Sequence, residues 1–232
     1  MGVLTHYYDH GEFKYPSVTT IIADCTDKSS ALTQWSANQV TEWIRQNSPK
    51  VGLIYGVTDE ALDIARFEYK NVSQQALDVG TAVHHAIEFF LKTGKEPVIE
   101  HDQAVAGYLA FLEWFDKNEC KTLATEQSVF GNCWAGTLDW KGYIKGKLYV
   151  VDWKTSKAIY TDYRYQIAAY RSTDAEVEGC GILRLDKETG YPEWKDFSKT
   201  YKKDLFVFEK MVELYFARHP ITAKKAGWNN GE

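Results

Sequence analysis

The sequence predicts an α/β fold in which helices cover a mixed central sheet. Apolar residues recur at helical spacing in the first part of the chain, alternate with period two in the middle, and return to helical spacing afterwards. Helices that precede and follow a run of strands indicate a sheet flanked by helices. Because 232 residues suffice for one well-formed core, we expect a single domain with an N-terminal helical cap.

The predicted domain has three segments, which are a cap or clamp over residues 1–75, a core over 76–220 and a flexible, frayed tail over 221–232. In the cap, Pro16 or Ser17 can begin a short helix. A second helix is expected to begin at Ser29 or Ser30 and to end at Gln46, because Ser48-Pro49 then interrupts the helical pattern.

A long helical region is predicted from Thr58 to Lys92, with a start at Thr58-Asp59-Glu60, a stop at Thr93-Gly94 and a break near Asn71-Val72-Ser73. In the core, the spacing of the apolar residues then changes between that of a helix and that of a strand. Its predicted elements are a helix at Asp102–Lys117, strands at Thr122–Phe130, Trp134–Ile144 and Leu148–Trp153, a helix at Asp162–Asp174, strands near Gly179–Leu185 and Glu193–Phe197, and a helix at about Lys202–Arg218.

Composition restricts the possible partners of this protein. A net charge of −5 provides no global basic field, so a polyanion would need a local basic patch or metal ions. No apolar run approaches the roughly 20 residues that span a bilayer, and no signal peptide is recognisable, so we expect no membrane partner. The cysteines lack Cys-x-x-Cys spacing, which predicts free thiols in a cytoplasmic setting. Phosphate-loop, serine-hydrolase and zinc-protease motifs are also missing from the sequence.

The strongest indication of function is a predicted hairpin that carries Asp139, Asp152 and Lys154. If Lys145-Gly146 is a two-residue loop, Asp139 stands opposite Asp152, with Lys154 on the same face. Opposed side chains lie about 4.5–5.5 Å apart, and two carboxylates so close repel each other unless a cation lies between them. Oxygen ligands suit Mg²⁺ or Mn²⁺, whereas a longer loop would shift the register and remove the site.

Other polar residues can join this hairpin. His84 lies on a predicted helix and can supply a nitrogen ligand, although a packed structural histidine explains it as well. Glu126 precedes the hairpin and can hold a metal or water, face solvent, or pair with a lysine. Gln166 and Tyr170 share a helix face and can bind phosphate oxygens, brace Lys154, or simply pack in the core.

The order of these motifs resembles the RecB-type branch of the PD-(D/E)XK nucleases. The matching motifs, in chain order, are Gly80-x-x-x-His84, Glu126, Gly136-x-x-Asp139, Asp152-x-Lys154 and Gln166-x-x-x-Tyr170. The opening Tyr15-Pro16-Ser17-Val18-Thr19-Thr20-Ile21-Ile22 is most similar to the mitochondrial genome maintenance exonuclease and its phage relatives. The resemblance implies a restriction-endonuclease-like fold. It also implies that the protein acts in the cytoplasm of a bacterial or phage-infected cell.

The resemblance also implies a role for each site residue. The implied catalytic residues are Asp139, Asp152, Lys154 and Glu126; the implied metal ligands are His84, Asp139, Asp152 and the Trp153 carbonyl; the implied substrate contacts are Gln166, Tyr170, Thr155 and Ser156. Several members of the family hold an iron–sulfur cluster with one early and three late cysteines. Here only Cys180 follows late after Cys25, so we expect no cluster.

The implied activity is Mg²⁺- or Mn²⁺-dependent hydrolysis of DNA, by an exonuclease that acts on free ends of single strands. A structure-specific or single-strand endonuclease and a non-catalytic nucleic-acid-binding module are the alternatives. A recombination or replication protein is a possible partner, and the polarity of digestion and the oligomeric state stay open.

Overall fold

The computed structural model describes residues 6–51 and 54–229, which form two compact units. One unit joins the N-terminal residues up to Thr26 to residues Ala82–Glu232, and the other contains Asp27–Thr81. The sheet and the predicted site residues belong to the first unit. This division differs from the predicted cap over residues 1–75, since residues 6–26 group with the sheet.

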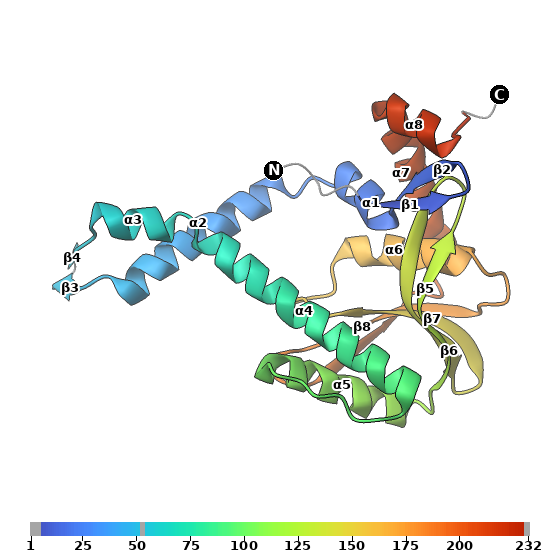
Figure 1. Ribbon diagram of the computed structural model, residues 1–232, viewed down its shortest axis with the longest axis horizontal. Helices are drawn as coiled ribbons and strands as arrows, with labels where there is room; N and C mark the ends of the chain where they lie inside the picture. The colour runs from blue at the N-terminus through green and yellow to red at the C-terminus, as the bar shows by residue number, and fades with distance from the viewer. Residues whose placement is uncertain (1–5, 52–53, 230–232) are drawn as a thin grey trace. The chain divides into compact units, whose positions relative to one another are not determined.

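A mixed five-stranded sheet forms the centre of the first unit, as predicted (Figure 1). Its strands, in spatial order, are β5 (Lys121–Phe130), β6 (Ala135–Ile144), β7 (Lys147–Lys154), β8 (Gly179–Leu185) and β9 (Pro192–Asp196). Only β7 and β8 pair in parallel, and α6 (Thr161–Ser172) connects them; the other neighbours are antiparallel. A parallel pair needs such a crossover, whereas hairpins join antiparallel strands.

The central hairpin has the predicted two-residue loop. Lys145 and Gly146 have φ values of 48° and 82°, and Ile144 pairs with Lys147. Positive φ at both loop residues is typical of the tight turns that match the twist of the flanking strands. The register continues as far as Trp140 and Val151, so Asp139 and Asp152 are the next opposed residues.

Helices cover both faces of this sheet (Figure 1). On one face, α5 (Asp102–Lys117) packs against Trp153, whose ring centroid lies 5.4 Å from that of Phe111. On the other face, α6 and α7 (Tyr201–Arg218) share a buried cluster with Val150. Because strand side chains alternate between faces, Asp152 and Lys154 lie on the α6 side.

A short N-terminal hairpin, absent from the sequence prediction, precedes the first helix. It consists of β1 (Tyr7–His10) and β2 (Phe13–Pro16), which turn at Gly11 with a φ of 62°. The predicted helix follows as α1 (Val18–Cys25), and the Ser17 hydroxyl accepts a hydrogen bond from the Thr20 backbone N–H. The apolar face of α1 lies in the core of the sheet unit, which explains why this segment belongs there.

The second unit is mainly helical. Its elements are α2 (Ser29–Asn47), β3 (Lys50–Val51), β4 (Ile54–Tyr55), α3 (Asp59–Ala65) and the first part of α4 (Glu68–Thr93). The predicted break near Asn71-Val72-Ser73 is wrong, because the chain breaks at Arg66-Phe67 instead. The weak helix propensity of Asn71, Val72 and Ser73 costs only a few tenths of a kcal/mol per residue, which is too little to interrupt a helix.

The predicted frayed tail is also wrong over most of its length. Residues Pro220–Ala226 form α8, which begins with proline and ends at Gly227 in the left-handed conformation. Ala226 is buried, and the Trp228 ring stacks on Phe216 with centroids 4.9 Å apart. Residues 230–232 lie outside the described part of the chain. None of the helices in the described residues has the length and apolarity required to cross a bilayer.

Candidate metal centre

The charged residues of the central hairpin meet where the end of β7 lies beside the middle of β6. Asp139 and Asp152 are 7% and 1% exposed. One oxygen of Asp139 accepts a hydrogen bond of 2.7 Å from the backbone N–H of Trp153, and Asp152 lies 2.6 Å from the Lys154 ammonium. The Asp139 carboxylate thus binds the backbone of the next strand just beyond the paired residues. Two buried carboxylates and one ammonium therefore form the centre of the cluster.

His84, on α4, lies against this cluster. Its Nδ1 is 3.7 Å from an Asp139 oxygen, and its ring also interacts with the Trp153 carbonyl. Burial, and then the positive charge of Lys154, lower the pKa of His84. The imidazole is therefore neutral at physiological pH, which is the form that binds metals. The structure thus brings His84 to the hairpin, as the helix motif predicts.

Glu126 completes the closest group of possible ligands. The pairing of its neighbours, Thr125 with Trp140 and Gln127 with Leu138, places it opposite Asp139. Ligand atoms of His84, Glu126 and Asp139 all lie within 4.8 Å of one another. Asp152, expected in this group, is instead held by Lys154 and α6, so Glu126 is the acid that lies with Asp139 and His84.

Glu126 also has an unusual backbone. Its φ of 51° lies in the left-handed region, within a strand and without glycine. Such a conformation costs about 1–3 kcal/mol and is concentrated at functional sites. The sequence carries no signal for this backbone, although the strand register alone could have paired Glu126 with Asp139.

The acids of the cluster are crowded enough to resist ionisation. Burial, and then the charge of Asp139, raise the pKa of Glu126 to about 7. Burial, and then Asp152, also raise the pKa of Asp139 well above its usual value. A bound cation would offset this repulsion, and carboxylate oxygens with one neutral imidazole suit Mg²⁺ or Mn²⁺. The donor set therefore fits the expected metal ions.

Glu126 should make the stability of the metal-free protein depend on pH. The pKa of Glu126 in the folded protein, about 7, exceeds the model-peptide value near 4.3. Its contribution to the free energy of unfolding is therefore fully present below about pH 4 and is lost by about pH 7. We expect Glu126→Gln to flatten the fall in stability over this interval in EDTA. Urea unfolding at several pH values measures the effect. An unchanged slope in the variant would contradict this assignment.

Gln166, on α6, binds one oxygen of Asp152, the other of which lies against Lys154, and Tyr170 on the same helix contacts Gln166. The Gln166 amide donates to one oxygen of Asp152 at 3.0 Å and to the Tyr170 hydroxyl at 3.1 Å. Both side chains are buried. Gly136 makes room for the tyrosine, because a Cβ there would lie 2.5 Å from the ring. These residues orient Asp152, and their contact with substrate stays a prediction.

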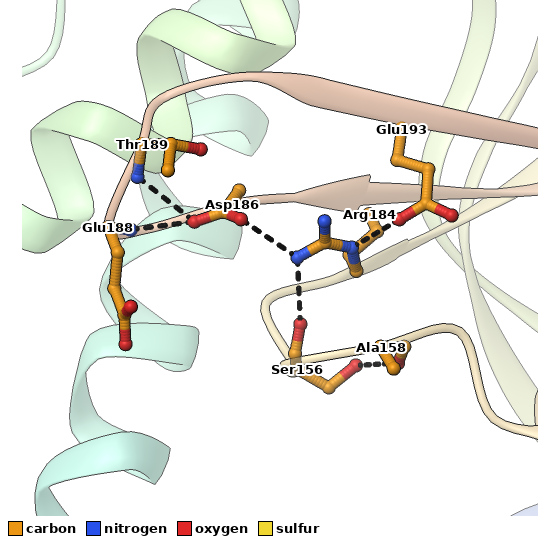
Figure 2. Close-up of polar contacts among 7 residues, drawn as sticks. All are labelled: Ser156, Ala158, Arg184, Asp186, Glu188, Thr189 and Glu193. Carbon is orange, nitrogen blue, oxygen red and sulfur yellow. Dashed lines mark hydrogen bonds and ion pairs between the residues drawn. The ribbon is translucent and has the colours of Figure 1, made fainter.

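The loop after β7 is fastened to the neighbouring strand by Arg184 (Figure 2). Arg184 donates to the Ser156 carbonyl at 3.5 Å and pairs with Asp186 and Glu193 at 3.1 and 2.6 Å. The Ser156 hydroxyl donates to the carbonyl two residues further on. Thr155, which follows Lys154 in the chain, is half-buried. The arginine therefore fixes the loop that contains the two predicted substrate contacts, Thr155 and Ser156.

Comparison with known proteins leaves the site to be interpreted from its own geometry. No protein-family model matches the chain, and no match is found among curated proteins. The fold and the site together define a mixed α/β protein with a buried cluster of acids, one imidazole and one ammonium on adjacent strands of its sheet.

Proposed function

We propose that this protein is a Mg²⁺- or Mn²⁺-dependent deoxyribonuclease of the PD-(D/E)XK class, with a restriction-endonuclease-like core. The observation that carries the proposal is the convergence of His84, Glu126 and Asp139, whose ligand atoms lie within 4.8 Å of one another, beside the Asp152–Lys154 pair. These residues come from three consecutive strands and from a helix that precedes them in the chain by about 40 residues at His84. A surface arrangement of unrelated charges would not bury two aspartates against a histidine and a lysine.

In this proposal, Glu126, Asp139 and His84 hold the metal ion, with Asp152 and the Trp153 carbonyl beside it. A divalent ion bound there supplies Lewis acidity to a phosphodiester. The neutral state of His84 and the crowding of the carboxylates both favour cation binding. The positive charge also reduces the repulsion between these acids and a DNA backbone.

Lys154 supplies the other positive charge. Burial alone would lower its pKa, but Asp152 and Asp139 more than offset this effect and raise the pKa, so the ammonium is charged at neutral pH. A charged donor at this position stabilises the negative charge that develops on the phosphate oxygens during hydrolysis. It can also orient the attacking water. Asp152, braced by Gln166, holds the ammonium in place.

The proposed substrate is single-stranded DNA, digested from free ends. This part of the proposal rests on the resemblance of the motif order to the RecB-type nucleases. A net charge of −5 also favours a site that contacts a short stretch of one strand over a broad basic surface for duplex DNA. Cleavage within a strand would instead identify the endonuclease alternative.

Digestion of end-labelled DNA tests this function. Linear single strands should shorten with Mg²⁺ or Mn²⁺ and stay intact with EDTA, whereas circular single strands should resist. Cutting of the circles would overturn the exonuclease but keep the nuclease. Binding without cleavage of any substrate under all metal conditions would favour the non-catalytic module.

A further inference from the structure

One face of the N-terminal hairpin is made of aromatic rings. Strand pairing sets Tyr8 opposite Tyr15 and His10 opposite Phe13, so these four side chains share a face. Phe130, the last residue of β5, joins them, with its ring centroid 4.6 Å from that of His10 and 6.4 Å from that of Tyr8.

Core packing explains only part of this face. Phe13 lies against Gly227 at the end of α8, and Tyr15 packs on the buried core. His10 is exposed, and Phe130 is 38% exposed although it contacts two other rings. We call Tyr8, His10 and Phe130 the aromatic edge. Because its rings contact one another, little conformational freedom remains to be lost on binding a flat ligand.

The aromatic edge is continuous with the candidate metal centre. The Tyr8 hydroxyl is 3.0 Å from the Thr137 hydroxyl, and Thr137 precedes Asp139 by two residues on β6. Tyr8 also lies close enough to Tyr170 to contribute, after burial and the nearby acids, to the raised pKa of that buried tyrosine. A strand bound at the metal centre can therefore extend onto the edge.

We propose that the aromatic edge stacks unpaired nucleobases of a DNA strand whose phosphodiester lies at the metal centre. This inference rests on the proposed function and names the part of the substrate that the site recognises. Every base has a flat face that stacks on aromatic rings, so such contacts bind single strands without sequence preference. The bases of a duplex already stack on one another. The face itself carries no carboxylate, since Asp9 alternates to the other side of the hairpin.

Oligonucleotides with and without bases test this inference. We compare binding of oligothymidylate with an abasic strand of equal length by fluorescence anisotropy in EDTA, so that no cleavage interferes. The wild-type protein should prefer the strand with bases by about 5-fold or more, since each stacked base contributes about 1–3 kcal/mol. The double variant His10→Ala, Phe130→Ala should lose most of this preference and bind the abasic strand as before.

Two further variants make the result specific. Phe206→Ala removes an exposed phenylalanine on α7 and should keep the full preference for bases. Phe130→Leu keeps apolar bulk without a ring and should weaken the preference even if the double variant folds poorly. Equal binding of both strands by the wild type, or an unchanged preference in Phe130→Leu and the double variant, would overturn the inference. The digestion assay reports separately on the proposed function, because cleavage without base preference rejects only the aromatic edge.

Discussion

Replacing Lys154 with alanine is expected to reduce cleavage of single-stranded DNA by at least about 100-fold. The loss of one preorganised donor to a developing negative charge typically lowers kcat by about 10²–10³-fold. Lys154 is the only cation within 4.0 Å of Asp152 among the described residues. Single-turnover digestion with saturating enzyme measures the chemical step apart from binding. DNA affinity should change much less, because the ammonium acts on charge that develops during the reaction.

This variant also has a structural cost. Removing one partner of a buried ion pair leaves an uncompensated charge, which typically costs about 3–5 kcal/mol. Activity must therefore be compared at temperatures where the variant is folded. Lys154→Met retains the packing of the lysine stem and should be equally inactive.

Lys141→Ala provides the matched control. Lys141 is also on the sheet and forms an ion pair, with Asp174, but it lies outside the cluster. Cleavage should stay within a few-fold of wild type. Wild-type turnover in both Lys154 variants would show that the ammonium has no part in hydrolysis and would overturn the role proposed for Lys154.

The central hairpin could be predicted from the sequence because local chemistry determines it. Lys145-Gly146 specifies a two-residue turn, and the period of the flanking residues then fixes which side chains share a face. The position of Asp139 against the next strand follows directly. The same reasoning predicted the ends of β5 to β9 and of α5 to α7 to within one or two residues of their observed positions. Register and periodicity are properties of short segments, so no tertiary information was needed.

The rest of the site depends on contacts between distant segments. The closeness of Glu126 to His84 requires both a left-handed backbone within β5 and the approach of α4, and neither is encoded in local propensity. Gln166 shares a helix face with Tyr170 as predicted, but its bond to Asp152 depends on how α6 packs on the sheet. The aromatic edge likewise requires the N-terminal hairpin to meet Phe130, the last residue of β5.

Replacing Asp139 with asparagine is expected to abolish stabilisation by Mn²⁺ and, with it, DNA cleavage. The amide is close in shape, and its oxygen can still accept the hydrogen bond from the Trp153 N–H. The amide carries no negative charge, however, so the metal ion loses an anionic ligand that its binding requires. A ligand at 100 times its Kd stabilises the folded state by about 2.7 kcal/mol, and this is the increment that the variant should lose. Thermal unfolding with Mn²⁺ and with EDTA measures it.

In the absence of metal, Asp139→Asn should not destabilise the folded protein. Burial and Asp152 raise the pKa of Asp139, so ionising this carboxyl at neutral pH opposes folding, and asparagine removes that opposition. Asp139→Asn should therefore be at least as stable as wild type in EDTA.

Asp174→Asn is the matched control, for which we expect the opposite change in stability. The hydrogen bond from Lys141 lowers the pKa of Asp174, so its carboxylate favours folding at neutral pH; asparagine there should reduce stability and leave the Mn²⁺ response intact. A full Mn²⁺ response in Asp139→Asn would show that this aspartate is not a ligand, and the proposed metal centre would then be wrong.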